Sequence, residues 1–328
     1  MYSNRNSYSN NKRRGDDKDK VNVLVINNQY IIWEKLGNGS FGEVFYGVDT
    51  KSKDSQKGVA IKMEPKKNKG KARLLTWEAK IYKYLNSREK KGIPHLHWIG
   101  EQDEFTIMVM DILGPDLDTL LQVCGGRFSL KTTLMLGMQM IKIINYIHGR
   151  GILHRDIKPQ NFLIGYSSDD HDLRIIDFGL CAKYKNSDGY HKEKKTNQSL
   201  VGTVRYSSVN SHEGITLSRR DDMESIGYVL IYMYTGNLPW KGIGKKNMDK
   251  EDKYKLIHKY KKNTPMKQLC ADCPKELSLY MDHVKNLSFE EKPDYNYLLG
   301  LFNNLFNIEG FEDDDEYDWI RVRRDKNR

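Results

Sequence analysis

The segment that most restricts how this chain can fold is Gly151–Ile164, with the sequence GILHRDIKPQNFLI. It places His, Arg, Asp, Lys and Asn side chains within the eight residues from His154 to Asn161, between an apolar periodic segment and the apolar FLI. Buried polar groups cost free energy unless each one has a partner. A simple buried turn has no reason to carry so many, whereas a site for phosphate and a metal ion does.

The first part of the ordered chain predicts a β-rich unit with one helix. The segments QYIIWEKLG and GEVFYGVDT are rich in β-branched and aromatic residues and flank a glycine-rich turn, and GVAIKME predicts a third strand. Apolar residues at helical spacing predict a helix over Leu74–Leu85, and Phe105–Leu113 is another apolar strand. We therefore expect an antiparallel β-meander followed by one helix and a further strand.

After Pro115 the pattern becomes helical. The segment SLKTTLMLGMQMIKIINYIHGRG predicts a long amphipathic helix, with Ser129 as the N-cap and Gly149 as its stop. Further helices are expected around Asp222–Tyr234, Lys253–Lys261 and Tyr295–Phe306. The fold class is α+β, with a polar N-terminal tail at 1–26, a small β-rich lobe at 27–112, a larger helical lobe at 113–312 and a charged tail at 313–328.

Composition excludes several classes of protein. No run of about 18 apolar residues is present, so no membrane span is expected. The N-terminus lacks a signal-peptide pattern, and four cysteines in 328 residues do not form a disulfide framework. Cys270 and Cys273 form one C-x-x-C without a second pair for zinc, so we expect ordinary thiols in a reduced cytoplasmic or nuclear protein. The net charge of +10 favours an anionic partner.

Two motifs in the β-rich part predict a phosphate site. Leu36–Val44, LGNGSFGEV, has glycines that let backbone N–H groups approach phosphates, although a plain glycine-rich hairpin fits it too. It joins two strands, whereas a dinucleotide-binding fingerprint opens a helix, which disfavours a Rossmann domain. Lys62 in VAIK lies on a strand and needs a partner if buried, and Glu78 on the next helix could supply it or simply face solvent.

Two further motifs predict a metal ion and a catalytic carboxylate. In HRDIKPQN, Asp156 would accept or orient the proton of an attacking hydroxyl, Lys158 would neutralise the transferred phosphoryl, and the amide oxygen of Asn161 would bind Mg²⁺. Asp177 in IIDFG would chelate the Mg²⁺ that bridges the β- and γ-phosphates.

These four motifs, in this order, resemble those of the eukaryotic protein kinases. The resemblance runs from about Tyr30 to Phe311 and implies the bilobal kinase fold, with ATP and Mg²⁺ bound between an N-lobe and a C-lobe. It implies that Thr203 bridges Asp156 and Lys158, and that Asp222 braces the catalytic loop. The residues implied in nucleotide binding are Leu36, Gly37, Asn38, Gly39, Ser40, Phe41, Gly42, Glu43, Val44, Ala60, Lys62, Met110, Asp111, Leu113 and Leu163.

Finer features resemble the casein kinase I family. SSVN replaces the usual A-P-E, and ILGP, SRRDDMESIGYVLIY, GNLPWKGI and KPDYNYL are similar to segments of that family. DIKPQN is the serine/threonine form of the catalytic loop. The resemblance implies acidic or phosphorylated protein substrates, whose anion would bind Arg205 and Lys253. A short insertion before Tyr254 leaves Lys250 or Lys255 as alternatives to Lys253.

The same resemblance implies an enzyme that does not require phosphorylation of its activation segment, although Thr196 and Ser199 lie there. The alternatives are a pseudokinase scaffold, a nucleic-acid-binding protein and a small-molecule kinase. All the catalytic residues are present, which disfavours the scaffold, and no recognised nucleic-acid module is present. The segments that resemble the casein kinase I family disfavour a small-molecule kinase. A monomer is favoured, although the sequence does not determine the oligomeric state.

Overall fold

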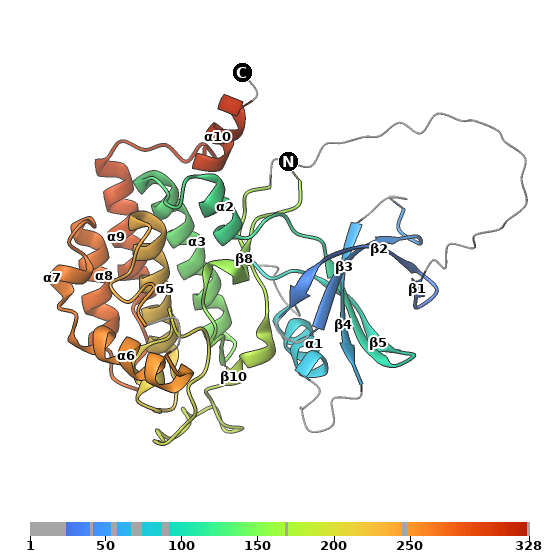
Figure 1. Cartoon of the computed structure of the whole chain (residues 1–328), viewed down its shortest axis with the longest axis horizontal. Coiled ribbons are helices and arrows are strands. Elements are labelled where there is room, and N and C mark those ends of the chain that lie inside the picture. Colours follow the sequence, from blue (N-terminus) through green and yellow to red (C-terminus); the bar gives the residue numbers. More distant parts are fainter. Residues whose placement is uncertain are drawn as a thin grey trace, which may run out of the picture.

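The computed structural model of the protein describes residues 24–39, 42–53, 58–66, 74–86, 92–167, 170–244 and 248–326. They form two lobes, with the long strands in one and most of the helices in the other (Figure 1). The elements of the small lobe are β1 (Val25–Ile26), β2 (Tyr30–Gly39), β3 (Gly42–Asp49), β4 (Gly58–Pro65), α1 (Leu74–Leu85), β5 (Leu96–Gln102) and β6 (Phe105–Asp111).

The strands of the small lobe form one antiparallel sheet in the order β1-β2-β3-β4-β6-β5. This confirms the predicted meander. The sheet also contains two strands that the pattern did not indicate. β1 lies inside the segment that we predicted to be a tail, and its Ile26 is buried beside Tyr30 because it covers the edge of the sheet core. Residues 1–23 lie outside the described residues.

Helix α1 has the bounds predicted for it and packs between the sheet and the large lobe. Leu75, Ile81 and Tyr82 are buried and belong to a hydrophobic cluster that continues into the large lobe. Glu78 is only 1% exposed, so the solvated-face interpretation of this residue is wrong.

The large lobe is built around α3 and α5. Its elements are α2 (Leu117–Val123), α3 (Leu130–Gly149), β7 (Ile152–Leu153), η1 (Pro159–Asn161), β8 (Phe162–Leu163), β9 (Arg174–Ile175), η2 (Phe178–Leu180), β10 (Ala182–Lys183), α4 (Val209–His212), α5 (Arg219–Thr235), α6 (Lys250–Asn263), α7 (Met266–Leu269), α8 (Lys275–Asn286), α9 (Tyr295–Ile308) and α10 (Asp318–Lys326). The four short strands of this lobe form two small antiparallel pairs, β7 with β10 and β8 with β9.

Helix α3 begins where the sequence predicts. The Ser129 side chain caps it by accepting a hydrogen bond from the Thr132 amide at 3.2 Å. The helix ends at Gly149, but the glycine that needs a left-handed backbone is Gly151, with φ of 77°. Gly151 therefore turns the chain from α3 into the polar segment.

The C-terminal segment that we predicted to be a charged tail contains the helix α10. Tyr317 and Trp319 are buried and stack at 4.6 Å between ring centroids, which holds the segment against the large lobe. The Asp318 carboxylate accepts a hydrogen bond from the Ser129 amide at 2.6 Å. Two buried aromatic residues thus order a segment whose composition is mostly charged.

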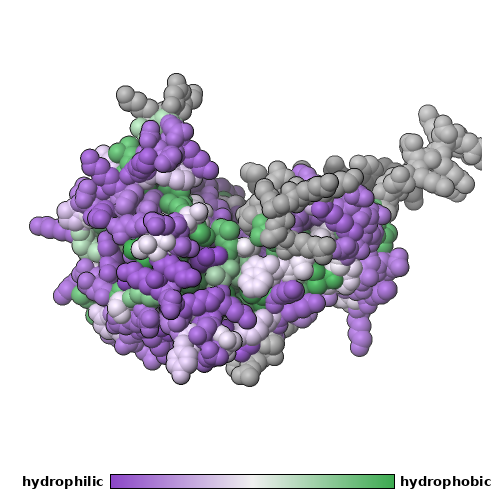
Figure 2. All heavy atoms as spheres, turned by 90° about the horizontal axis from the view of Figure 1, so that it is seen from below, coloured by the Kyte–Doolittle hydropathy of each residue, from purple (hydrophilic) through white to green (hydrophobic). Residues whose placement is uncertain are grey.

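Polar residues dominate the face of the molecule shown in Figure 2, with hydrophobic residues scattered near the waist between the lobes. Over the described ranges, no helix combines the length and the apolar character needed to cross a bilayer.

Candidate active site

A buried ion pair joins β4 to α1. The Lys62 ammonium lies 2.8 Å from a Glu78 carboxylate oxygen, and their side chains are 9% and 2% exposed. Lys62 also lies 4.0 Å from Oδ1 of Asp177, which belongs to the large lobe. Burial opposes the charge on Lys62, but the carboxylates of Glu78 and Asp177 raise its pKa above the ordinary value. A permanent cation is thus held where the two lobes meet.

The Asp156 carboxylate is fixed from two sides. Its Oδ1 accepts hydrogen bonds from the amide and the hydroxyl of Thr203, both at 2.8 Å. Its Oδ2 accepts from the Lys158 ammonium at 2.6 Å. The structure therefore brings Lys158 and Thr203 to the same carboxylate, where Thr203 bonds Asp156 directly and reaches Lys158 only through it, and the carboxylate keeps little rotational freedom.

The backbone geometry at this position depends on a glycine. Arg155 has a φ of 67° and Gly202, from the facing segment, a φ of 87°. A Cβ on Gly202 would lie 2.4 Å from the Arg155 carbonyl oxygen and 3.5 Å from Oδ1 of Asp156. Only glycine at this position allows the two segments to approach so closely, so Gly202 lets Thr203 reach Asp156.

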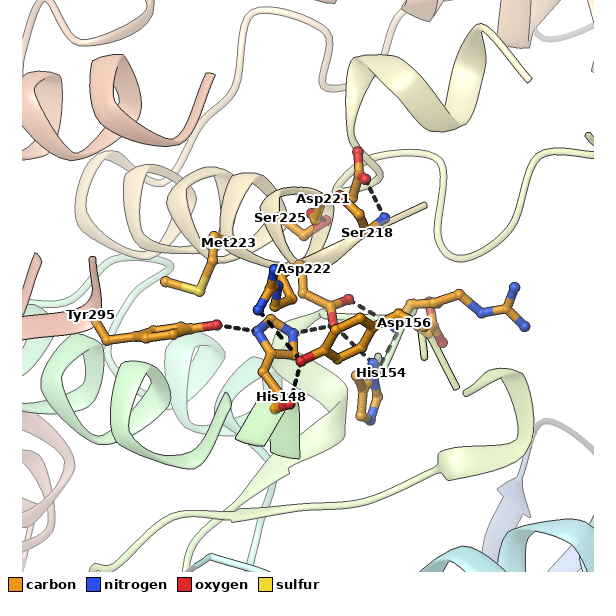
Figure 3. A network of polar contacts seen from close by, with 12 residues as sticks. His148, His154, Asp156, Ser218, Asp221, Asp222, Met223, Ser225 and Tyr295 are labelled. Carbon is orange, nitrogen blue, oxygen red and sulfur yellow. Dashed lines mark hydrogen bonds and ion pairs between the residues drawn. The ribbon is translucent and has the colours of Figure 1, made fainter. Parts of the chain in front are cut away.

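Asp222 at the start of α5 holds the catalytic loop by its backbone. Its two carboxylate oxygens accept from the amides of His154 and Arg155, each at 2.8 Å. Figure 3 shows that His148 of α3 lies on the other side of Asp222 and contacts Tyr295 of α9. Burial opposes the negative charge of Asp222, but its bond to His148 and its other donors lower its pKa. The loop is therefore anchored to three helices.

The segment after Asp177 connects α1 to the catalytic loop. Asp177 has a left-handed backbone with φ of 69°, and its amide donates to the Tyr82 hydroxyl at 3.2 Å. The Phe178 ring packs edge-on against Tyr82 at 5.0 Å and against His154 at 5.1 Å between centroids. These contacts form an unbroken stack from α1 to the loop held by Asp222. Next to it, Cys181 is buried, and burial raises the pKa of its thiol to about 12.

The donor set beside Asp156 fits a hard cation such as Mg²⁺. The Asn161 amide nitrogen donates to the Asp156 carbonyl at 2.8 Å, which leaves the amide oxygen as the group for a cation. Asp177 supplies a carboxylate. Among the described residues no group of three or more His, Cys, Asp or Glu could hold a metal ion, and Cys270 and Cys273 are free thiols. Oxygens of phosphate and water would therefore complete the shell around Asn161 and Asp177.

The residues predicted to contact the nucleotide line up across β2, β3, β4 and β6. Val44 pairs with Lys62 across β3 and β4, and Ala60 pairs with Met110 across β4 and β6. Leu163 on β8 forms an isolated bridge with Asp116, while Asp111 ends β6 and Leu113 follows it.

The glycine-rich turn is described only in part. Leu36 is 46% exposed, a position open to a ligand. A Cβ on Gly42 would meet the Met63 carbonyl at 2.1 Å, whereas Gly37 has open space. Glu43 pairs with Lys35. Ser40 and Phe41 lie outside the described residues, and only the strand backbone is described for Asn38 and Gly39.

The two residues predicted to bind a substrate anion lie on different elements. Arg205 follows Thr203 directly, and its guanidinium lies over the rings of Tyr206 and Tyr232. Lys253 is exposed on the first turn of α6. Over the described chain, no contact joins Arg205 to Lys253. The prediction for Lys253, and its alternatives Lys250 and Lys255, stays a prediction.

Sequence reasoning missed several residues that shape the site. His148 and Tyr295 lie 147 positions apart and meet in space, and Lys261 of α6 contacts the segment around Arg205. The only signal for Lys261 was its place in a basic helix, which did not distinguish it from its solvated neighbours. Contacts between distant segments leave no local periodic pattern.

One family model matches this chain. The model of the protein kinase domain covers residues 30–292, well over half of the chain. The matched region contains the ion pair of Lys62 and Glu78, the catalytic loop and Asp177, while Tyr295 lies beyond it.

Proposed function

This chain belongs to the protein kinase family, and from that premise we propose that it is an active serine/threonine kinase of the casein kinase I type. Its substrates in this proposal are acidic or already phosphorylated proteins, whose serine or threonine hydroxyls receive the γ-phosphoryl group of ATP. The observation that carries the proposal is the Asp156 carboxylate, held between Thr203 and Lys158 in a single orientation.

The fixed carboxylate has a defined task in this mechanism. Asp156 accepts the hydrogen bond of the substrate hydroxyl and orients its oxygen for in-line attack on the phosphorus. The hydroxyl proton passes towards Asp156 as the new O–P bond forms and the bond to the ADP oxygen breaks. Lys158, 2.6 Å from Asp156, stabilises negative charge on the transferred group.

The nucleotide and metal would be held by residues from both lobes. Magnesium neutralises charge on the phosphates when bound, and Asn161 and Asp177 provide its protein oxygens. Lys62 interacts with the α- and β-phosphates while Glu78 fixes its position. The glycine-rich segment approaches the phosphates from β2 and β3.

Two features support the choice of substrate class. Arg205 lies two residues after Thr203, on the same segment that contacts the catalytic Asp156. Within the described residues no carboxylate lies in ion-pair distance of Arg205, and its cation is available to an anion. Arginine binds phosphate and carboxylate groups through paired N–H donors.

The test compares phosphate transfer from ATP to two matched peptides. One has phosphoserine three residues before the acceptor serine, and the other has alanine there. We expect the primed peptide to be preferred at least about tenfold, and Arg205→Ala to remove most of that preference, because a charge-assisted bond is lost. Arg321→Ala, an exposed arginine of α10, is the matched control.

Each other outcome has a distinct meaning. Equal rates on the two peptides would retain the kinase and overturn the substrate class. Nucleotide binding without any transfer, to either peptide or to a denatured acidic protein, would favour the alternative of a pseudokinase scaffold.

A further inference from the structure

Lys261 on α6 is a buried lysine that the catalytic scheme does not use. It is only 1% exposed, although lysine is rarely buried without a partner. Its ammonium donates to the Val204 carbonyl at 2.8 Å and to the Ser207 carbonyl. It also lies over the rings of Tyr228 and Trp240, at 5.1 and 5.3 Å from their centroids. Carbonyl oxygens and ring faces both stabilise a cation.

The segment that Lys261 contacts is a tight turn next to the catalytic carboxylate. The amides of Tyr206 and Ser207 donate to the Thr203 carbonyl at 2.8 and 3.0 Å. No backbone amide of this turn donates to the carbonyls of Val204, Arg205 and Ser207, and within the turn only the Ser207 hydroxyl reaches one of them, the Val204 carbonyl, at 3.3 Å. Side chains from elsewhere in the large lobe donate to all three carbonyls. Lys261 donates to the carbonyls of Val204 and Ser207, and the Trp240 indole N–H donates to the Arg205 carbonyl at 2.8 Å.

These donors are fixed firmly in the large lobe. Trp240 is 2% exposed and packs edge-on against Tyr228 at 4.9 Å between centroids. Burial lowers the pKa of Lys261 to about 7, and Glu224 acts in the opposite direction. Because Trp240 and Lys261 are both buried in the large lobe, they hold the turn in a fixed position.

We propose that Lys261 is a positioning residue for the protein substrate, and that Trp240 assists it. By fixing the carbonyls of Val204, Arg205 and Ser207, Lys261 sets where Thr203 meets Asp156 and where Arg205 faces the peptide. The inference rests on the proposed function, because it assigns a role in peptide binding to residues beneath that site. Lys261 itself touches neither substrate nor nucleotide.

Two variants and one matched control test this role. Lys261→Met removes the donors while retaining an apolar stem, and Trp240→Phe removes one donor to the same turn while retaining an aromatic ring. The control is Lys262→Met, since Lys262 is 59% exposed at its side chain and pairs with Glu213 at 2.8 Å instead of the turn. Peptide KM, ATP KM and kcat are measured for each, together with amide hydrogen exchange at Tyr206 and Ser207.

We expect Lys261→Met to raise peptide KM about tenfold, the effect of losing one strong interaction, while ATP KM changes by less than about twofold. Exchange at Tyr206 and Ser207 should become faster. Trp240→Phe should give a smaller change of the same kind and decides the question if Lys261→Met does not fold. Lys262→Met should match the wild type.

Unchanged peptide KM and unchanged exchange in a folded Lys261→Met protein would overturn the proposal. Equal rises in peptide KM and ATP KM would also overturn it, since they indicate general damage. If the wild type transfers no phosphate to any peptide, the proposed function fails and the substrate role fails with it. Exchange at the turn would then still show whether Lys261 holds it.

Discussion

At the residue scale, the proposed function assigns Asp156 to the chemical step and not to nucleotide binding. Asp156→Asn retains the volume of the side chain and an oxygen that can accept from Thr203, but the amide cannot take a proton. We expect phosphate transfer to fall at least about a hundredfold, with ATP affinity within about twofold of the wild type. Radiolabel transfer and equilibrium nucleotide binding, measured on the same preparation, test this.

Asp172→Asn is the matched control for that variant. Its side chain is 81% exposed, and the same chemical change there should leave the transfer rate unaltered. An Asp156→Asn protein that transfers phosphate at the control rate would contradict the assignment of Asp156.

Single residues were predictable where a motif fixes their neighbours in sequence. Lys62, Glu78 and Asp156 meet the partners that the motifs indicate. His148 and Lys261 could not be predicted, because their partners lie on helices and turns far away along the chain. For such residues the packing of whole elements decides which groups meet.

At the element scale, the activation segment is held by contacts within the chain. The amide of Lys195 donates to the Thr216 hydroxyl, and the amide of Thr216 to the Lys195 carbonyl, both at 2.9 Å. Gln198 donates to the Gly214 carbonyl at 2.8 Å. Arg155 is already engaged, since its Nε donates to the Leu180 carbonyl at 2.6 Å. These bonds, all between groups of the chain itself, hold the segment in place.

We therefore expect phosphatase treatment to change the transfer rate by less than about twofold, because a phosphate would add few new contacts to a segment already ordered. Peptide assays before and after treatment check this, with mass spectrometry to confirm that Thr196 and Ser199 carry no phosphate. Thr196→Ala and Ser199→Ala should behave like the wild type. A loss of activity on treatment, reproduced by either variant, would contradict this prediction.

Elements were predictable in proportion to their regularity. Helix α1 has a clear apolar periodicity and was predicted with its observed bounds. Strand β5, LHWIGEQ, lacks strict alternation and contains glycine, so its pairing with β6 creates a strand that its own sequence does not indicate. At α10, the buried Trp319 within the helix and the buried Tyr317 just before it order a segment of charged composition.

At the scale of the whole molecule, the two lobes meet at the proposed nucleotide site. Lys62 of the small lobe faces Asp177 of the large lobe, and one hydrophobic cluster runs through α1 into the large lobe. The apolar strand and helix patterns predicted both lobes and their order. They could not predict that the core continues between the lobes, because that depends on which faces pack together.

A ligand bound between the lobes should stabilise the fold. At a concentration of 100 times Kd, ATP with Mg²⁺ should add about 2.7 kcal/mol to the free energy of unfolding. For a folded domain of about 300 residues we expect a rise in Tm of about 4 °C, measured by differential scanning fluorimetry. EDTA, or Asp177→Asn, should remove most of the magnesium-dependent part. An equal rise with and without magnesium would contradict the metal assignment.

Buried Cys181 has a consequence for chemical probes of this enzyme. Electrophilic inhibitors react with a thiolate. Because the pKa of the Cys181 thiol is about 12, only about one protein molecule in 10⁵ carries the thiolate at pH 7. Its side chain is also packed among Phe178 and the core of the large lobe. A cysteine therefore follows the Asp177–Gly179 motif by only two positions, yet a covalent warhead delivered to the nucleotide cleft would find it neither accessible nor reactive.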